Sequence, residues 1–260
     1  MQYAYAYQLN GTQAGGLDPD AKSYILAVEA ADGQTLESGV KNAYNTFVKG
    51  CKSDGTWNAI KSSCIMAGAR TLSGALVPLK GTAPTNFNFV SGDYNRKTGL
   101  VGNGTTKYLD SNRNNNADPQ NSKSTGTWTT AFGIIGGVSL GSGGADTGAS
   151  TIGSITGSMR NNCSSISLGG LTGYTGFAGS SRSSSAEYTR RLNSSNTLIT
   201  QASQTPQNRN ILLFASNTGV GGGSFSDNRM SFYHIGEATN LASLNSRVST
   251  LMTEISAAIP

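Results

Sequence analysis

The sequence predicts a mainly β protein, in which a β-sandwich follows a small α-helical N-terminal unit and is closed by a C-terminal helix. The chain of 260 residues contains 34 glycines, and only 13% of its residues are charged. Because each glycine inside a helix costs roughly 1 kcal/mol relative to alanine, this composition favours strands and loops. From Leu72 onward, short apolar runs alternate with turn residues, a pattern typical of a sandwich or a jelly roll.

The first residues of the chain carry an aromatic alternation. Tyr3, Tyr5 and Tyr7 are separated by alanines, and this period of two predicts a strand with one aromatic face. Such a terminal strand either closes the chain's own sheet, as terminal strands usually do, or adds to the sheet of a neighbouring molecule. We assign residues 1–17 to an N-terminal arm and regard the three tyrosines as candidate assembly contacts.

Residues 18–80 form the predicted helical unit. Asp18 is a capping residue and Pro19 suits the first helical position, so the sequence predicts that a helix begins here. Asp32 and Gly33 provide the turn residues that end it. The buried stripe of this helix is expected to consist of Tyr24, Ile25 and Val28.

Two more helices are predicted within the same unit. Apolar residues at three- and four-residue steps between Leu36 and Val48 indicate a second amphipathic helix, which stops near Gly50. A third, shorter helix is predicted to open near Asp54. Its apolar residues are Trp57, Ile60, Cys64 and Ile65.

The sandwich is predicted to occupy residues 81–260. Its last part, residues 210–255, has the pattern of a strand, a glycine loop, a strand and a helix capped by Thr239 or Asn240. The buried face of that helix is expected to contain Leu241, Leu244, Val248, Leu251, Met252 and Ile255. The predicted strands are 98–101, 107–110, 128–135, 151–155, 165–168, 173–178, 187–192, 211–215 and 230–235.

The acidic residues of the β-region do not predict an enzyme. Hydrolysis of a glycosidic bond needs two carboxylates across that bond, and no two acids here occupy alternate positions of one predicted strand, although distant residues can meet in a fold. His234 lies in the apolar run MSFYHI, where a histidine is most often a core residue with one satisfied nitrogen. The chain also lacks a GxSxG elbow. The sequence therefore predicts no catalytic residue.

An oxygen-rich stretch allows two interpretations. Asp110, Asn112, Asn114, Asn116 and Asp118 place side-chain oxygens at every second position, as a calcium loop could. The sixth and twelfth positions hold asparagine, however, where an EF-hand needs glycine and glutamate. The alternative is an asparagine-rich loop whose side chains bond their own backbone. Calcium stays an open possibility, and no residue is assigned as a metal ligand.

Loops at the ends of the sandwich are the candidate binding surface. Exposed rings and amides can hold a sugar by stacking and hydrogen bonding. The alternative is that the aromatic side chains belong to the core. The candidate ligand-binding residues are Asn114, Asn116, Tyr174, Phe177 and Arg182.

Charge, cysteine spacing and hydropathy favour neither a nucleic-acid-binding, a metal-binding nor a membrane-spanning protein. The net charge of +5 comes from scattered lysines and arginines, whereas nucleic-acid binding usually needs a concentrated basic stripe. Cys51, Cys64 and Cys163 follow no metal spacing, so buried free thiols are favoured over a bridge between the first two. The N-terminus has no signal-peptide pattern, and no apolar window is long enough to span a membrane. We expect a protein made in a cytoplasm, without a cofactor.

Several motifs resemble a known domain type. TGLVGNGTTKYLDS resembles a strand-turn-strand of concanavalin A-like, laminin-G-type jelly-roll domains, and WTTAFGII resembles their next central strand. NILLFASN and RMSFYHIGEATNLASLNSRVSTLM resemble their closing strands and tail helix. Together with the helical stretch before it, this region is similar to structural proteins of tailed bacteriophages.

The resemblance implies a non-enzymatic component of a virion, made in the host cytoplasm. The protein would act on a tail fibre or baseplate as a lectin-like adhesin for a host surface glycan, or on the head as a decoration protein that stabilises the capsid. A glycoside hydrolase on the same fold is a more distant alternative. Its partners would be other virion proteins, and a homo-oligomer such as a trimer would match symmetric attachment points.

Overall fold

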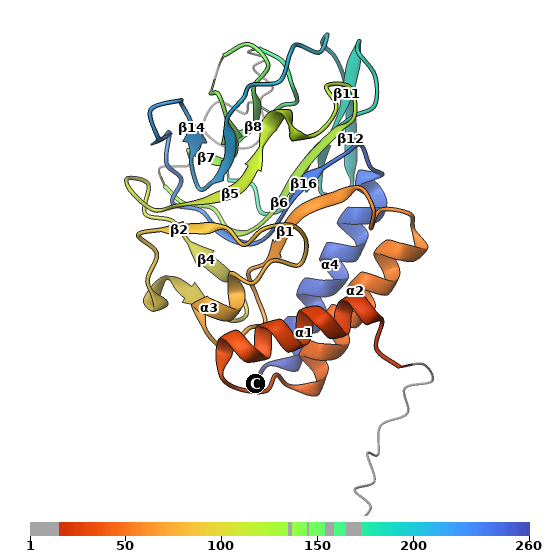
Figure 1. Cartoon of the computed structure of the whole chain (residues 1–260), viewed down its shortest axis with the longest axis vertical. Helices are drawn as coiled ribbons and strands as arrows, with labels where there is room; N and C mark the ends of the chain where they lie inside the picture. The colour runs from red at the N-terminus through yellow and green to blue at the C-terminus, as the bar shows by residue number, and fades with distance from the viewer. Residues whose placement is uncertain (1–15, 135–136, 145, 154–158, 165–172) are drawn as a thin grey trace, which may run out of the picture.

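The computed structural model describes residues 16–134, 137–144, 146–153, 159–164 and 173–260. In this part of the chain the fold is mainly β, with two sheets, short N-terminal helices and a C-terminal helix. Figure 1 shows the longer helices together on one side of the molecule and the strands on the other. The helical segments are α1 (Pro19–Asp32), α2 (Ser38–Ser53), α3 (Leu72–Ala75), α4 (Leu241–Ala258) and the 3₁₀ turns η1 (Ser91–Asp93) and η2 (Asn115–Ala117).

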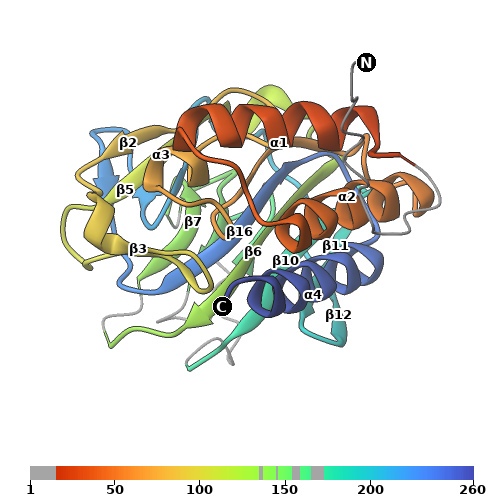
Figure 2. The same cartoon turned by 90° about the horizontal axis from the view of Figure 1, so that it is seen from below.

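Sheet A lies next to the helices. Its strand order is β12-β11-β10-β6-β16-β4-β3, with β1 also paired to β16, and all of its pairings are antiparallel. Figure 2 shows α2 and α4 side by side next to β16, β6 and β10. The strands are β1 (Ile60–Ile65), β3 (Tyr94–Asn95), β4 (Gly99–Val101), β6 (Lys123–Ala131), β10 (Gly176–Arg182), β11 (Glu187–Leu192), β12 (Ser195–Thr200) and β16 (Arg229–Gly236).

Sheet B forms the layer on the far side of sheet A. Its main order is β15-β14-β7-β13-β5-β2, and β8 joins β9 to β7. Its pairings are antiparallel except for the parallel contact of β14 with β7. The strands are β2 (Thr85–Phe87), β5 (Tyr108–Asn114), β7 (Val138–Ser142), β8 (Ser150–Gly153), β9 (Met159–Arg160), β13 (Asn210–Leu213), β14 (Ser216–Asn217) and β15 (Gly222–Gly223).

The ends of α1 and α4 follow the predicted local signals. The Asp18 carboxylate accepts a hydrogen bond from Asp20 N at 3.0 Å, Pro19 is the first helical residue, and Gly33 closes α1 with φ 64°. Asn240 caps α4 by accepting from the amides of its first turn at 2.9 and 3.2 Å. Both helix predictions are confirmed. The six apolar residues predicted for the buried face of α4 are all buried.

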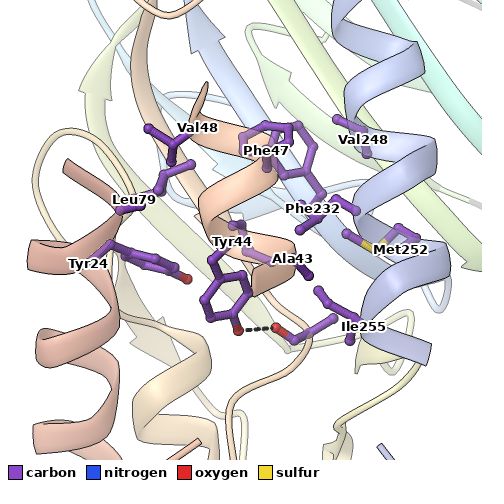
Figure 3. Close-up of a cluster of buried hydrophobic side chains, with 14 of the residues drawn as sticks. Tyr24, Ala43, Tyr44, Phe47, Val48, Leu79, Phe232, Val248, Met252 and Ile255 are labelled. Atoms are coloured by element: carbon purple, nitrogen blue, oxygen red, sulfur yellow. Dashed lines mark hydrogen bonds between the residues drawn. The ribbon is translucent and has the colours of Figure 1, made fainter. Parts of the chain in front are cut away.

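A hydrophobic core joins the helices to sheet A. Figure 3 shows Phe47 of α2 facing Phe232 of β16 and Val248 of α4. The rings of Phe47 and Phe232 meet edge to face at 5.8 Å, and the Tyr44 hydroxyl donates to Ala67 O at 2.7 Å. Residues 18–80 therefore share their core with α4 and with the centre of sheet A.

A second core fills the space between the two sheets and has an apolar and a polar half. Tyr233 and Ile235 of β16 pack with Leu109, Leu213 and other apolar residues of sheet B. Farther along β6, the inward side chains are threonines, and Thr125 bonds Ser180 of β10 at 3.2 Å. A bonded pair such as Thr125 and Ser180 favours the pairing of β6 with β10, because a buried hydroxyl without a partner costs free energy; Thr127 Oγ1 is one such hydroxyl within the described residues.

The predicted third helix is wrong. Residues 60–65 form β1, which pairs with β16, and the Ser63 hydroxyl donates to Tyr233 O at 2.7 Å. Both faces of β1 are buried, because Ile60 packs under the helices and Cys64 faces sheet B. A short apolar run that is buried on both faces has no periodicity that separates a strand from a helix.

Asp32, at the end of α1, fastens the helices to the loop after β1. Its carboxylate accepts from Arg70 N at 2.7 Å, from Thr71 N at 2.8 Å and from the Thr71 hydroxyl at 2.7 Å. The side chain is 7% exposed, and Gly74 passes so close to it that an added Cβ would lie 2.2 Å from a carboxylate oxygen. Glu37 reinforces the same loop through an ion pair with Arg70 at 3.2 Å.

His234 belongs to the core, as the sequence predicts. Its ring is fully buried between Phe177 and Phe232, and Gly126 leaves room for it on β6. The Ser124 hydroxyl donates to Glu237 O at 2.7 Å, so it accepts from the protonated Nε2 of His234 at 3.2 Å. Nδ1 finds no hydrogen-bond partner among the residues that the structure describes.

We expect the change Asp32→Ala to lower the free energy of unfolding by about 2–4 kcal/mol, because hydrogen bonds to a charged group are lost and buried amides are left unpaired. Urea unfolding followed by circular dichroism measures this. The control is Asp146→Ala, which removes an exposed carboxylate from its surface pair with Arg209 and should cost about 1 kcal/mol or less. Equal losses in the two variants would contradict the role of Asp32.

The protein should also lose stability as the pH is lowered, and His234 should account for part of this loss. Burial lowers the pKa of this histidine to about 3, below its ordinary value of 6.5. As the pH falls below 6.5, His234 is therefore protonated in the unfolded chain but stays neutral in the folded protein. The free energy of unfolding is fully present above pH 6.5 and decreases below it. Between pH 7.5 and 5 the loss is about 2 kcal/mol.

The variant His234→Gln removes this titration while keeping a side chain that can bond Ser124. Because His234 is the only histidine of the chain, the variant should show a flatter stability curve over that pH range. Urea unfolding at several pH values gives both curves. If the stability curves of the variant and of the unchanged protein run parallel, the His234 ring is not held neutral in the folded state.

Candidate functional site

The strongest candidate site is a polar groove where β10, β11 and β12 meet the start of α4. We call it the polar groove. Its volume of about 420 Å³ is in the range of small-molecule sites, and both views of the fold place β11 and β12 near the first turn of α4 (Figures 1 and 2). The lining residues are Ser181, Ser183, Thr189, Asn196, Ala238, Thr239, Asn240 and Leu241.

Strand register brings these side chains to one face of sheet A. Ser181 of β10 pairs with Thr189 of β11, so the two side chains point the same way. Phe177 lies on the same face four residues earlier, where the helices cover it. The polar groove is therefore the continuation of the helix-covered face, beyond the point where α4 begins.

The polar groove offers hydrogen-bond donors that the fold leaves unused. Asn196 Oδ1 accepts from the Arg191 guanidinium at 2.7 Å, and Asn240 Oδ1 accepts the two capping bonds of α4. Each amide thus has its oxygen fixed, and within the described part of the chain neither Nδ2 donates to a partner. Ser181 Oγ accepts from Thr239 N at 3.0 Å. Oriented amides and hydroxyls of this kind suit a polyhydroxylated ligand.

The amides predicted as ligands in the asparagine-rich loop hold the loop together. Asn114 caps η2 by accepting from Asn116 N at 3.1 Å, and its amide donates to Asn208 at 2.8 Å. Asn116 is exposed and does not line the polar groove. This bonding pattern is the asparagine-rich loop that the sequence offered as the alternative to a calcium site.

The two acids of that stretch are engaged by protein groups. Asp118 is 3% exposed and forms ion pairs with Arg113 and with the buried Lys123, whose ammonium lies 2.9 Å from Oδ2. These cations lower the pKa of Asp118 against the raising effect of burial. Asp110 accepts from Asn112 N and from Asn210. Within the described residues, no group of three His, Cys, Asp or Glu side chains could hold a metal ion.

Phe177 and Arg182 are interior residues, so they do not form the exposed surface that the sequence predicts. Phe177 is fully buried and stacks on His234. Arg182 is also fully buried, and its guanidinium donates to backbone oxygens of Asn161 and Gln201, both at 2.9 Å, and lies over Tyr188. Burial lowers the pKa of this arginine.

The remaining sequence predictions concern Tyr174, the N-terminal tyrosines, one strand and the cysteines. Tyr174 is half-buried, and its hydroxyl donates to Phe177 O and accepts from Asn193 N, which closes a turn. Tyr3, Tyr5 and Tyr7 lie outside the described residues, as does the strand predicted at 165–168. The three cysteines are free and buried, as predicted.

Sequence reasoning missed the polar groove because its residues come from four separate segments. The segment 195–200, with the sequence SNTLIT, contains three β-branched residues that could have indicated β12. Nothing local to Ser181 or Asn196 signals that α4 begins beside them. The sequence predicted the strand that carries Thr189 and the helix start at Asn240, but not that the two lie in one groove.

Among the described helices, none combines the length and the apolar character that crossing a bilayer requires. No protein-family model matches the chain, and no curated protein matches its sequence. The function must therefore be argued from the geometry of the polar groove and from the resemblance of the sequence motifs.

Proposed function

We propose that this protein is a non-enzymatic surface component of a bacteriophage virion that recognises a host saccharide through the polar groove. The proposal includes the finer fold assignment, in which the two sheets form a concanavalin A-like jelly roll of the laminin-G type. It places the protein on a tail fibre or baseplate, after synthesis in the host cytoplasm. The resemblance of the sequence motifs supports a place in a virion. The polar groove supports recognition of a saccharide.

The observation that carries the proposal is the set of oriented amides. Asn196 and Asn240 present Nδ2 donors whose own oxygens are fixed by Arg191 and by the first turn of α4. Sugar hydroxyls accept such bonds, and prior fixation of the amides reduces the entropy lost on binding. Serine and threonine hydroxyls of β10 and β11 add groups that donate or accept.

The engagement of the acids supports binding over hydrolysis. The described side chains that line the polar groove include no carboxylate. Asp118, Asp146 and Glu237 are held in ion pairs with basic side chains of the fold. A glycoside hydrolase needs a pair of carboxylates across the bond that it cleaves. An assay of reducing-end release from host polysaccharide tests this directly, and turnover would overturn the proposal.

One observation favours head decoration as a second candidate function. Phe87 on the edge strand β2 is 37% exposed and stacks on Tyr108 at 4.3 Å, and Val90 is 60% exposed. Exposed apolar side chains on a strand edge suit packing against other virion proteins. Head decoration predicts that particles lacking the protein adsorb normally but lose resistance to heat.

The polar groove is tested by the changes Asn196→Asp and Asn240→Asp. Each keeps the oxygen that Arg191 or α4 requires and removes the Nδ2 donor. Loss of one such hydrogen bond should weaken binding to purified host surface polysaccharide by about tenfold, without lowering the melting temperature. Calorimetric titration measures the affinity.

The matched control is Gln34→Glu, which adds the same charge at an exposed amide outside the polar groove. It should bind like the unchanged protein. Full affinity in both aspartate variants would refute the polar groove as the saccharide site.

A further inference from the structure

A second groove lies between the start of α1, the turn after α2 and the loop that follows α3. We call it the lysine groove. Its volume is about 480 Å³, and its lining residues are Asp20, Lys52, Gly55, Trp57, Asn58 and Lys80. It shares no residue with the polar groove.

Trp57 forms a rigid wall of the lysine groove. Its backbone amide donates to Cys51 O at 3.1 Å, and its indole N–H donates to Asp20 Oδ2 at 3.2 Å. The side chain is only 5% exposed. The ring is thus too covered to serve as a stacking platform, and its role is to position the charged groups around it.

Both the backbone and the ammonium group of Lys80 are held in place. Its backbone forms a bridge with Ser63 of β1, through Ser63 N to Lys80 O at 3.1 Å and Lys80 N to Ser63 O at 3.4 Å. Its ammonium lies 4.3 Å from the centre of the Trp57 ring. The cation therefore points over the ring and into the groove.

Lys80 has no carboxylate counterion in the described part of the chain. Among the described residues no acid forms an ion pair with it, although the residue is half-buried. Burial lowers its pKa, and the nearby Lys61 and Lys52 lower it further, against the attraction of Asp20. A partly desolvated cation of this kind gains most from an added negative charge.

The acids of the neighbourhood are already engaged. Asp20 lies 2.6 Å from Lys52 Nζ and also accepts from Trp57, and Glu237 pairs with Lys61 at 3.0 Å. Lys52 is shared further with Asp18 at 2.7 Å. Lys52 therefore serves two carboxylates and Lys61 serves one, which leaves Lys80 as the lysine of this neighbourhood that forms no ion pair within the described residues.

We propose that the lysine groove binds an oxyanion of the phosphate class, with Lys80 as the principal contact and Lys52 as the second cation. An oxyanion in the groove accepts charge-assisted hydrogen bonds from the ammonium groups, which are stronger than bonds between neutral partners. The exposed amide of Asn58 adds a donor at the rim. The proposal does not depend on saccharide adhesion, because the two grooves are separate.

The phosphate could be free or part of a phosphate ester in a polymer. The two tryptophans of the chain, Trp57 and Trp128, give two indole N–H signals in a protein labelled on tryptophan, and the change Trp128→Phe assigns them. Inorganic phosphate and glycerol phosphate are titrated separately at constant ionic strength set with chloride. Each should move the Trp57 signal and leave the Trp128 signal in place.

The deciding variant is Lys80→Gln, which should weaken phosphate binding by about tenfold or more. Lys80→Arg retains the charge and should retain binding. Lys22→Gln removes the same charge from an exposed position of α1 outside the lysine groove and should bind normally. A dispersed Trp57 signal in each variant confirms that it is folded.

The two titrations distinguish a site for phosphate esters from a site for the phosphate group alone. Tighter binding of glycerol phosphate assigns the site to phosphate esters, and equal binding assigns it to the phosphate group alone. A Trp57 signal that does not move with either probe, or one that moves equally in Lys80→Gln and Lys22→Gln, overturns the proposal. Variants of the polar groove leave this titration unchanged, so failure here does not count against saccharide adhesion.

Discussion

The pairing of β16 in the centre of sheet A is the constraint on which the rest of the structure depends. This strand pairs with β6, β4 and β1, and its side chains serve both cores. Phe232 packs under the helices, whereas Tyr233 packs against sheet B. A one-residue slip would exchange these faces and place His234, which needs the gap at Gly126, against the wrong layer. The register of β16 thus fixes how helices and sheets are stacked.

Both grooves arise where the helix layer stops covering sheet A or its connections. The polar groove begins where α4 starts, because Ser181 and Thr189 extend the face that Phe177 buries farther back. The lysine groove forms at the turn from α2 into β1, where Trp57 closes the core and leaves Lys80 at its edge. The same helices that stabilise the fold therefore border both the polar groove and the lysine groove. Their chemistry differs, since one presents neutral amides and the other a lysine that forms no ion pair with the described carboxylates.

Buried charge explains why some residues that look like ligands are structural. Arg182 satisfies its guanidinium with backbone oxygens of several loops, and Lys123 satisfies its ammonium with Asp118 and Asn115 O. Such groups are costly to bury alone, but once fully bonded they tie together segments that are far apart in the sequence. An arginine near a strand end looks the same in the sequence whether it is buried or exposed.

The sequence by itself determined α1, α2 and α4, most of the longer strands and the burial of His234, because caps and periodicity involve residues a few positions apart. Only the tertiary structure decided that residues 60–65 form a strand, since Ser63 bonds a carbonyl 170 positions away. It also decided that Phe177 and Arg182 face the interior, and that Asn196 and Asn240 meet in one groove. Partners distant in the chain leave no local pattern, so strand pairing and burial set these features.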